Sequence, residues 1–219
     1  MKTLTKAMQD AITPSMALDL LKKGNERFIS NLKINRNLLQ QANETSDGQH
    51  PFAVILSCID SRTSAELIFD QGLGDIFSVR IAGTVINDDI LGSLEFGCKV
   101  AGAKIIVVLG HTQCGAIKGA CDHVEMGHLT TLLDKIKPAV MAEKTILENR
   151  TSSNDAFVEK VTALSIQKTF DDIMERSPIL KTMIEAGTCG IVGGIHNIST
   201  GEVHFYPHAR SGLDTHASS

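Results

Sequence analysis

The sequence predicts an α/β fold, with a doubly wound, mostly parallel central sheet, flanking helices and an N-terminal helical arm. Two apolar runs, Ala53–Leu56 and Ile105–Leu109, do not alternate with polar residues, which is typical of strands buried on both faces. Helical periodicity separates the candidate strands, and this favours right-handed βαβ crossovers. The 219 residues show no break in composition, so we expect one domain. We divide it into an arm at residues 1–50, a core at 51–207 and a tail at 208–219.

The arm is expected to contain one amphipathic helix. Thr13 and Pro14 are typical of an N-cap and a first helical position. Apolar residues then recur at helical spacing, at Ala17, Leu20, Leu21, Gly24 and Phe28. Charged residues occupy the other side, so the apolar face of this helix needs a surface to cover.

In the first half of the core, we expect a third strand at Ile76–Ile81. A helix follows it, beginning near Asn87 or Asp88. Glu95 and Lys99 stand four residues apart in that helix, so we expect them to pair on its outer face.

In the second half of the core, helices are expected first, one after His111 and two or three more before residue 186. Ile191–Ile195 is another apolar run without alternation, which predicts a fourth buried strand. Val203 and Phe205 alternate with polar neighbours, as in an edge strand. The tail that follows is expected to be disordered from Arg210 onwards.

Charge and cysteine content exclude several classes of protein. The formal net charge is −4 and the basic residues are scattered, so neither nucleic acid nor a membrane surface is expected as a partner. No apolar stretch follows the N-terminal lysines, so we expect no secretory signal. Five cysteines in such a chain favour reduced thiols or metal ligands over disulfides. We therefore expect a cytoplasmic protein.

Two short motifs carry the chemistry, and each directly follows a predicted buried strand. They are Cys58-Ile59-Asp60-Ser61-Arg62 and His111-Thr112-Gln113-Cys114-Gly115. Ligands bind at the carboxyl ends of strands in open parallel sheets. If the two strands are neighbours, Cys58, His111 and Cys114 converge, and two thiolates with one imidazole suit zinc.

Three protein ligands would leave the fourth tetrahedral position open, which is typical of a catalytic zinc site. A structural zinc is the alternative, with a fourth ligand from Cys98, Cys121 or Cys189. A cysteine hydrolase using His111 is a further alternative, although no oxyanion hole is evident.

Asp60 and Arg62 lie two and four residues after Cys58. An aspartate beside an arginine stays ionised, so Asp60 can accept the proton of a metal-bound hydroxide. The same carboxylate can also close the fourth position of the zinc, and Arg62 would hold it away. A surface ion pair without a catalytic role is the alternative.

The paired motifs C-x-D-S-R and G-H-x-x-C-G resemble those of the β-class carbonic anhydrases. The resemblance extends from Gln49 to Gly119, and more loosely to Tyr206. It implies reversible hydration of carbon dioxide to bicarbonate by a zinc-bound hydroxide, with Asp60 and Arg62 as the catalytic pair. It implies one Zn²⁺ per chain on the three ligands named above. It also implies a homodimer or a dimer of dimers, with the N-terminal helix lying across the partner.

The resemblance assigns substrate-binding residues one at a time. Gln49 matches a glutamine that orients the substrate, and Gly115 offers its backbone N–H. Phe77, Ile81 and Phe96 match an apolar wall to which both subunits contribute. Phe96 replaces a tyrosine, and the match at Ile81 requires a one-residue gap.

Another branch of the family is inhibited by bicarbonate at a second site built from a tryptophan, an arginine and a tyrosine. This chain has no tryptophan and a single tyrosine, Tyr206; Arg80 alone matches. We therefore expect the enzyme to remain active at neutral pH. Two alternatives remain for its function, a carbon disulfide or carbonyl sulfide hydrolase on the same scaffold and a non-catalytic zinc-binding protein.

Overall fold

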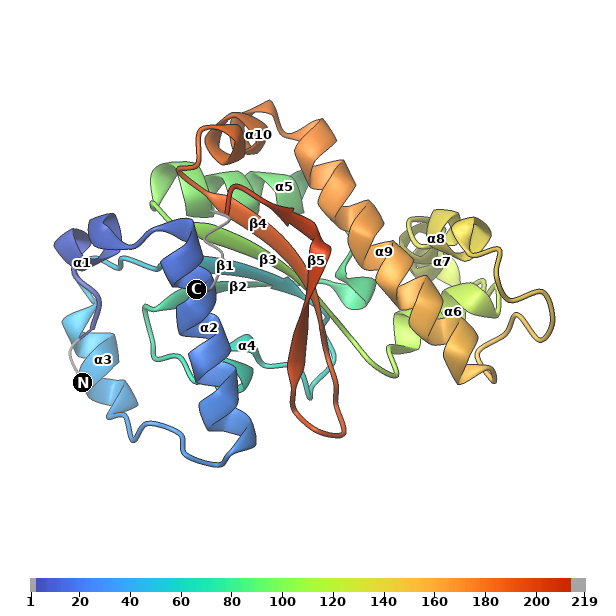
Figure 1. Ribbon diagram of the computed structural model, residues 1–219, viewed down its shortest axis with the longest axis horizontal. Helices are drawn as coiled ribbons and strands as arrows, with labels where there is room; N and C mark the ends of the chain where they lie inside the picture. Colours follow the sequence, from blue (N-terminus) through green and yellow to red (C-terminus); the bar gives the residue numbers. More distant parts are fainter. Residues whose placement is uncertain (1–2, 214–219) are drawn as a thin grey trace, which may run out of the picture.

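The computed structural model describes residues 3–213 and contains a five-stranded sheet in the order β2-β1-β3-β4-β5 (Figure 1). The strands are β1 Ala53–Ser57, β2 Ile76–Arg80, β3 Ile105–His111, β4 Gly190–His196 and β5 Val203–Ser211. The first four strands run parallel, and β5 pairs antiparallel with β4. The sheet therefore has the mostly parallel arrangement that the sequence predicts.

Helices cover both faces of this sheet. They are α1 Lys6–Ala11, α2 Pro14–Ile29, α3 Leu38–Glu44, α4 Ala65–Ile68, α5 Asp88–Glu95, α6 Gly115–Cys121, α7 Gly127–Asp134, α8 Lys137–Ala142, α9 Asp155–Arg176 and α10 Pro178–Glu185, with a 3₁₀ turn η1 Ala82–Thr84 and a π-helical turn η2 Phe96–Val100. Helices α2 and α4 pack on one face, and α5, α9 and α10 pack on the other. The prediction of a doubly wound α/β fold is thus confirmed.

The buried strands divide their side chains between two apolar cores. In β1, Val54 and Leu56 face the core under α5, α9 and α10, while Ala53 and Ile55 face the core under α2 and α4. All four are 0% exposed. A strand covered on both faces needs apolar residues at every position, which explains the run without alternation.

The strand order reverses between β1 and β3, which are neighbours in the sheet. Crossovers from these two strands leave in opposite directions, so the helices that follow them diverge. This is the topological switch point, where ligands bind at the carboxyl ends of the strands. The fold therefore places both sequence motifs at the same edge.

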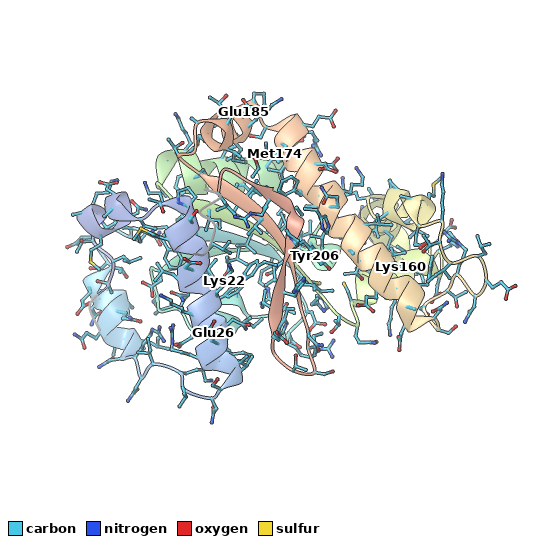
Figure 2. The ribbon with its side chains drawn as sticks, in the orientation of Figure 1. Lys22, Glu26, Lys160, Met174, Glu185 and Tyr206 are labelled. Carbon is cyan, nitrogen blue, oxygen red and sulfur yellow. The ribbon has the colours of Figure 1, made fainter. Side chains whose placement is uncertain are left out.

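Helix α2 begins as predicted, since the Thr13 side chain accepts a hydrogen bond from the Met16 N–H. Much of its apolar face packs against the chain's own sheet. Ala17, Leu18 and Leu21 are buried against the chain's own sheet. Leu20, expected on that face, is 40% exposed. Lys22 and Glu26 lie on the exposed side of the helix (Figure 2).

Two further expectations need correction. Helix α5 does not continue regularly but passes into the π-helical turn η2, and Glu95 accepts a hydrogen bond from Ser177 instead of pairing with Lys99. The predicted tail at residues 208–219 begins too early, because β5 continues to Ser211. Residues 214–219 lie outside the described part of the chain. Among residues 3–213, no helix combines the length and the apolar character needed to cross a bilayer.

Candidate metal centre

The structure brings together the three metal ligands predicted from the sequence. Cys58 directly follows β1, His111 is the last residue of β3, and Cys114 is the N-cap of α6. Their ligand atoms all lie within 4.8 Å of one another. The three residues are 4%, 1% and 2% exposed, respectively. Within residues 3–213, no other His, Cys, Asp or Glu belongs to this group, so the chain supplies no fourth ligand from Cys98, Cys121 or Cys189.

The imidazole of His111 is oriented for a metal. Its Nδ1 lies 2.9 Å from the Thr112 carbonyl oxygen, which accepts a hydrogen bond from a protonated Nδ1. Its Nε2 is buried and has no hydrogen-bond partner in the described chain. A buried nitrogen without a partner is costly, and metal-binding histidines commonly donate their other N–H to an oxygen. The orphaned Nε2 beside two sulfur atoms therefore fits a zinc ligand set.

The two thiols at the centre interact directly. The contact with the Cys114 thiol is the largest cause that lowers the pKa of Cys58, and the neighbouring His111 imidazole acts in the same direction. The same contact, together with burial, raises the pKa of Cys114. A dication between the two sulfurs would favour the thiolate form of both.

Backbone N–H groups also point at these sulfurs. Gly83 and Asp60 donate to Cys58, and Ala116 and Ile117 donate to Cys114. Gly83 has φ +72°, a backbone conformation that residues with a side chain rarely adopt. Our sequence analysis did not identify Gly83, for which the available signal is a glycine shortly after a predicted strand.

Asp60 and Arg62 form a two-pronged ion pair beside the metal ligands. The Arg62 Nε donates to Asp60 Oδ1 at 2.9 Å and its Nη2 donates to Oδ2 at 2.8 Å. The Arg62 backbone N–H also donates to Oδ1 at 2.9 Å. These hydrogen bonds hold the pKa of Asp60 well below its usual range. The carboxylate is therefore ionised at neutral pH and lies near the metal centre.

Sequence reasoning missed the positions of two further side chains. Arg80, at the end of β2, donates hydrogen bonds to the backbone carbonyls of Cys58 and Asp60. His196 is the register partner of His111 across β3 and β4, is 3% exposed, and has no partner for either ring nitrogen among the described residues. Burial, with a contribution from His111, lowers the pKa of His196 to about 4, so its imidazole is neutral at pH 7.

The expected substrate-binding residues are more dispersed. Phe77 and Phe96 lie together, with ring centroids 6.3 Å apart, in a hollow of about 590 Å³ that no metal ligand lines. Ile81 is half-buried and packs against the cluster that contains Cys58 and Cys114. Gly115 is the first residue of α6 and is exposed. Gln49 is exposed in the segment that leads to β1.

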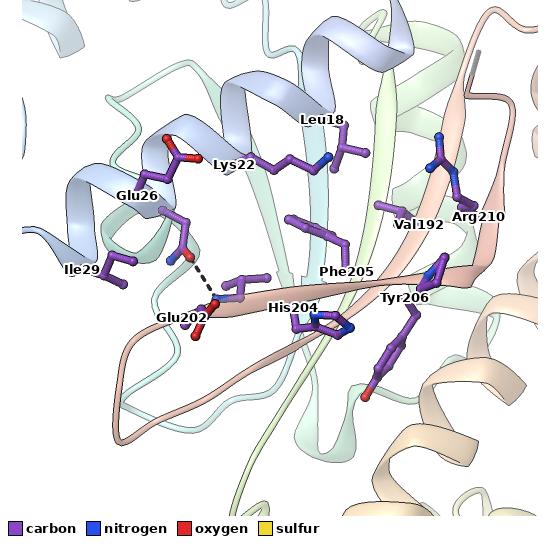
Figure 3. A pocket seen from close by; sticks show the side chains of 13 residues that line it. Leu18, Lys22, Glu26, Ile29, Val192, Glu202, His204, Phe205, Tyr206 and Arg210 are labelled. Carbon is purple, nitrogen blue, oxygen red and sulfur yellow. Dashed lines mark hydrogen bonds between the residues drawn. The ribbon is translucent and has the colours of Figure 1, made fainter. Parts of the chain in front are cut away.

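A separate groove of about 350 Å³ lies between α2 and β5 (Figure 3). Its lining includes Lys22, His204 and Arg210. The Val203 N–H donates to the Asn25 side chain across it at 2.9 Å. The groove holds no metal-ligand group, so its size alone does not make it a site.

Comparison with known proteins agrees with this geometry. A family model described as carbonic anhydrase matches residues 53–203. The chain is 34% identical over 207 residues to carbonic anhydrase 2 of Mycobacterium tuberculosis, and 32% identical over 201 residues to a carbonic anhydrase of Mycolicibacterium smegmatis. Each alignment covers 89% of this chain and 94% of the relative.

Solved structures show the same fold. The β-carbonic anhydrase CafA of Aspergillus fumigatus superposes with a TM-score of 0.68 at 26% identity, covering 77% of this chain and 81% of that one. The β-carbonic anhydrase CcaA superposes with a TM-score of 0.69 at 24% identity, covering 86% and 85%.

The fold and the Cys-His-Cys group together describe an α/β protein with a buried group that could hold a metal ion. The chain belongs to the carbonic anhydrase family, in its β class. The sequence-based prediction of an enzyme that reversibly hydrates carbon dioxide is confirmed, and the sulfur-gas hydrolase and the non-catalytic protein are not favoured.

Proposed function

We propose that carbon dioxide hydration takes place at one zinc ion per chain, held by Cys58, His111 and Cys114. The orphaned, buried Nε2 of His111 beside the two sulfurs carries this proposal. When bound, zinc supplies Lewis acidity, which makes a hydroxide nucleophile available near neutral pH. The three residues would leave one tetrahedral position for the reaction, because no fourth ligand joins the group within residues 3–213.

Asp60 is proposed as the residue that orients the nucleophile. Its carboxylate is held ionised by Arg62, so it can accept a hydrogen bond from the attacking oxygen and direct a lone pair at the carbon of the substrate. Both carboxylate oxygens accept hydrogen bonds from Arg62. This supports a site in which Asp60 does not bind the metal, so that the fourth metal position stays open at neutral pH.

The pocket for carbon dioxide is proposed to form between two copies of this chain. Carbon dioxide is neutral and apolar, so apolar walls suit it. Phe96 is 55% exposed and its ring lies tilted against that of Phe77, which supports a second copy covering this surface. Gln49, Ile81 and Gly115 are proposed to complete the substrate site. Two β-carbonic anhydrases of Sordaria macrospora are tetrameric, and we propose a homodimer or a dimer of dimers here. We also propose that the protein works in the cytoplasm, where thiol ligands remain reduced.

Stopped-flow hydration of carbon dioxide tests the proposal, with zinc content measured on the same preparation. Measurements at about pH 7 and about pH 8.5 should both show fast turnover that depends on zinc. Turnover only at the higher pH would contradict the open site but not the enzyme. No turnover at either pH, with one zinc per chain, would contradict the proposed reaction and make carbonyl sulfide and carbon disulfide the next substrates to assay.

A further inference from the structure

In the turn that carries Cys58 and Asp60, Cys58 packs in an apolar cluster, but the residues after it are largely exposed. Ile59, between them, is 61% exposed, and Ser61 and Arg62 are also exposed. The turn therefore depends on hydrogen bonds for its conformation. Two side chains donate to its backbone carbonyls, Thr63 directly after the motif and Arg80 from the neighbouring strand β2. The Thr63 backbone N–H also donates to the Asp60 carbonyl oxygen at 3.0 Å.

Arg80 spans the turn from outside. Its Nε lies 2.9 Å from the Cys58 carbonyl oxygen, and its Nη2 lies 2.6 Å from the Asp60 carbonyl oxygen. The sheet fixes the backbone position of Arg80. Arg80 is the register partner of Ser57, and the N–H of the next residue, Ile81, donates to the Ser57 carbonyl at 3.0 Å. Two N–H donors of the planar guanidinium thus bind backbone carbonyls of the same chain.

Thr63 cannot replace this contact. Its hydroxyl lies 3.2 Å from the Cys58 carbonyl oxygen and 2.9 Å from that of Asp60, but a hydroxyl has one hydrogen to donate. A lysine at position 80 would present a point charge on a flexible stem, whereas the planar guanidinium holds two acceptors at a fixed separation.

We propose that Arg80 is a positioning residue for carbon dioxide hydration, which fixes the turn so that the Cys58 sulfur and the Asp60 carboxylate keep their places at the metal centre. Arg62 holds the side chain of Asp60, and Arg80 holds its backbone. The proposal rests on the proposed function for its catalytic consequence, and on the hydrogen bonds alone for its effect on the metal centre.

The test compares Arg80→Ala with wild type and with Arg176→Ala. Arg176 pairs with the exposed Asp88, so its removal is a matched loss of one guanidinium away from the turn. We expect kcat of zinc-loaded Arg80→Ala to fall about 10- to 100-fold, as when an outer partner of a metal ligand is lost. We expect KM, zinc stoichiometry and melting temperature to stay near the wild-type values. Guanidinium ion at tens of millimolar should restore part of the lost turnover, and Arg176→Ala should behave as wild type.

A second readout does not depend on turnover. The visible absorption of the cobalt(II)-loaded protein reports the ligands and geometry of the metal, and we expect Arg80→Ala to change it while Arg176→Ala leaves it unchanged. An inactive wild type would contradict the proposed function but leave this comparison intact. Wild-type kcat together with a wild-type cobalt spectrum in Arg80→Ala would overturn the proposal. A loss that follows the melting temperature and is not rescued by guanidinium would also overturn it. If Arg80→Ala does not fold, Arg80→Lys is measured in the same way and is expected to lose kcat and change the spectrum.

Discussion

Two pairs of buried thiols lie in this molecule, and they differ in almost everything except burial. Cys58 and Cys114 meet at the carboxyl edge of the sheet beside His111, whereas Cys98 and Cys189 meet within the core under α5 and α10, with their sulfurs 3.7 Å apart. All four cysteines are at most 4% exposed. Proximity and burial therefore do not distinguish a metal site from a packing contact.

The surrounding donors make the difference. Beside its contact with Cys114, the Cys58 sulfur has the His111 imidazole and the backbone N–H groups of Gly83 and Asp60, and all of these lower its pKa. The backbone N–H groups of Ala116 and Ile117 act in the same direction on Cys114, against its contact with Cys58 and burial. The contact with Cys189 together with burial raises the pKa of Cys98 well above its usual value, and among residues 3–213 no backbone donor opposes them. A thiolate is the metal ligand, and hydrogen-bond donors stabilise a thiolate. The pair that is surrounded by such donors is therefore the one prepared for zinc.

Replacing Cys58 with Ser is expected to have the largest effect. It removes a soft thiolate ligand, so zinc content should fall far below one per chain. Turnover should fall by more than the roughly 100-fold typical of losing an outer partner. Metal analysis and stopped-flow assays on Cys58→Ser measure both quantities, and Cys98→Ala is the matched control. Full zinc content in Cys58→Ser would show that this pair is not the metal site.

Asp60→Asn separates catalysis from metal binding at the first pair. The amide keeps the shape of the carboxylate, but it is neutral and has one acceptor oxygen instead of two. We expect turnover to fall about 10²- to 10⁴-fold, the range typical of a lost proton-accepting group. Zinc content and melting temperature should remain near wild type, because Asp60 is not one of the clustered ligands. Unchanged kcat with normal zinc would exclude Asp60 from the reaction.

The same contrast applies to two buried carboxyl groups. Burial raises the pKa of Asp75, whose side chain accepts from the Gly72 N–H. Burial acts in the same direction on Asp70, but hydrogen bonds from Arg27, Arg36 and the Ile34 N–H outweigh it and lower the pKa of Asp70.

Asp70→Asn is therefore expected to reduce stability in a pH-dependent way. A carboxyl group with a lowered pKa in the folded state stabilises the protein above its unfolded-state pKa of about 3.9, and that contribution is lost as the pH falls through the folded-state value. The loss should be about 2–3 kcal/mol at pH 7, because Arg36 keeps a buried charge without its partner. Urea unfolding of both proteins from pH 7 to pH 3 measures the difference, which should shrink below about pH 4. A difference that stays constant over this range would contradict the assignment.

The metal ligands could be predicted from the sequence because the order and direction of the strands determine where these residues lie. Apolar runs identify β1 and β3, and parallel neighbours bring the residues after them to one edge. Arg80 could not be predicted in its observed role, because its contact with Cys58 depends on the register of β2 against β1. The Glu95–Lys99 pair was wrong because a π-helical turn changes the spacing after Glu95. The surface that α2 packs against could not be predicted for a different reason. Periodicity shows that a helix has an apolar face, but not which surface covers that face.

The smallest effect is expected at the second thiol pair. Cys98→Ala removes one sulfur from the core between α5, α10 and the sheet, where it acts as a small apolar group. We expect a loss of about 1 kcal/mol in the free energy of unfolding, the usual size for a modest core truncation. Zinc content and turnover should be unchanged, because neither sulfur of this pair belongs to the metal group. Urea unfolding and metal analysis of the same preparation measure this outcome. A fall in zinc content would mean that burial near a second sulfur, and not the hydrogen-bond donors around it, is what makes a metal site in this fold.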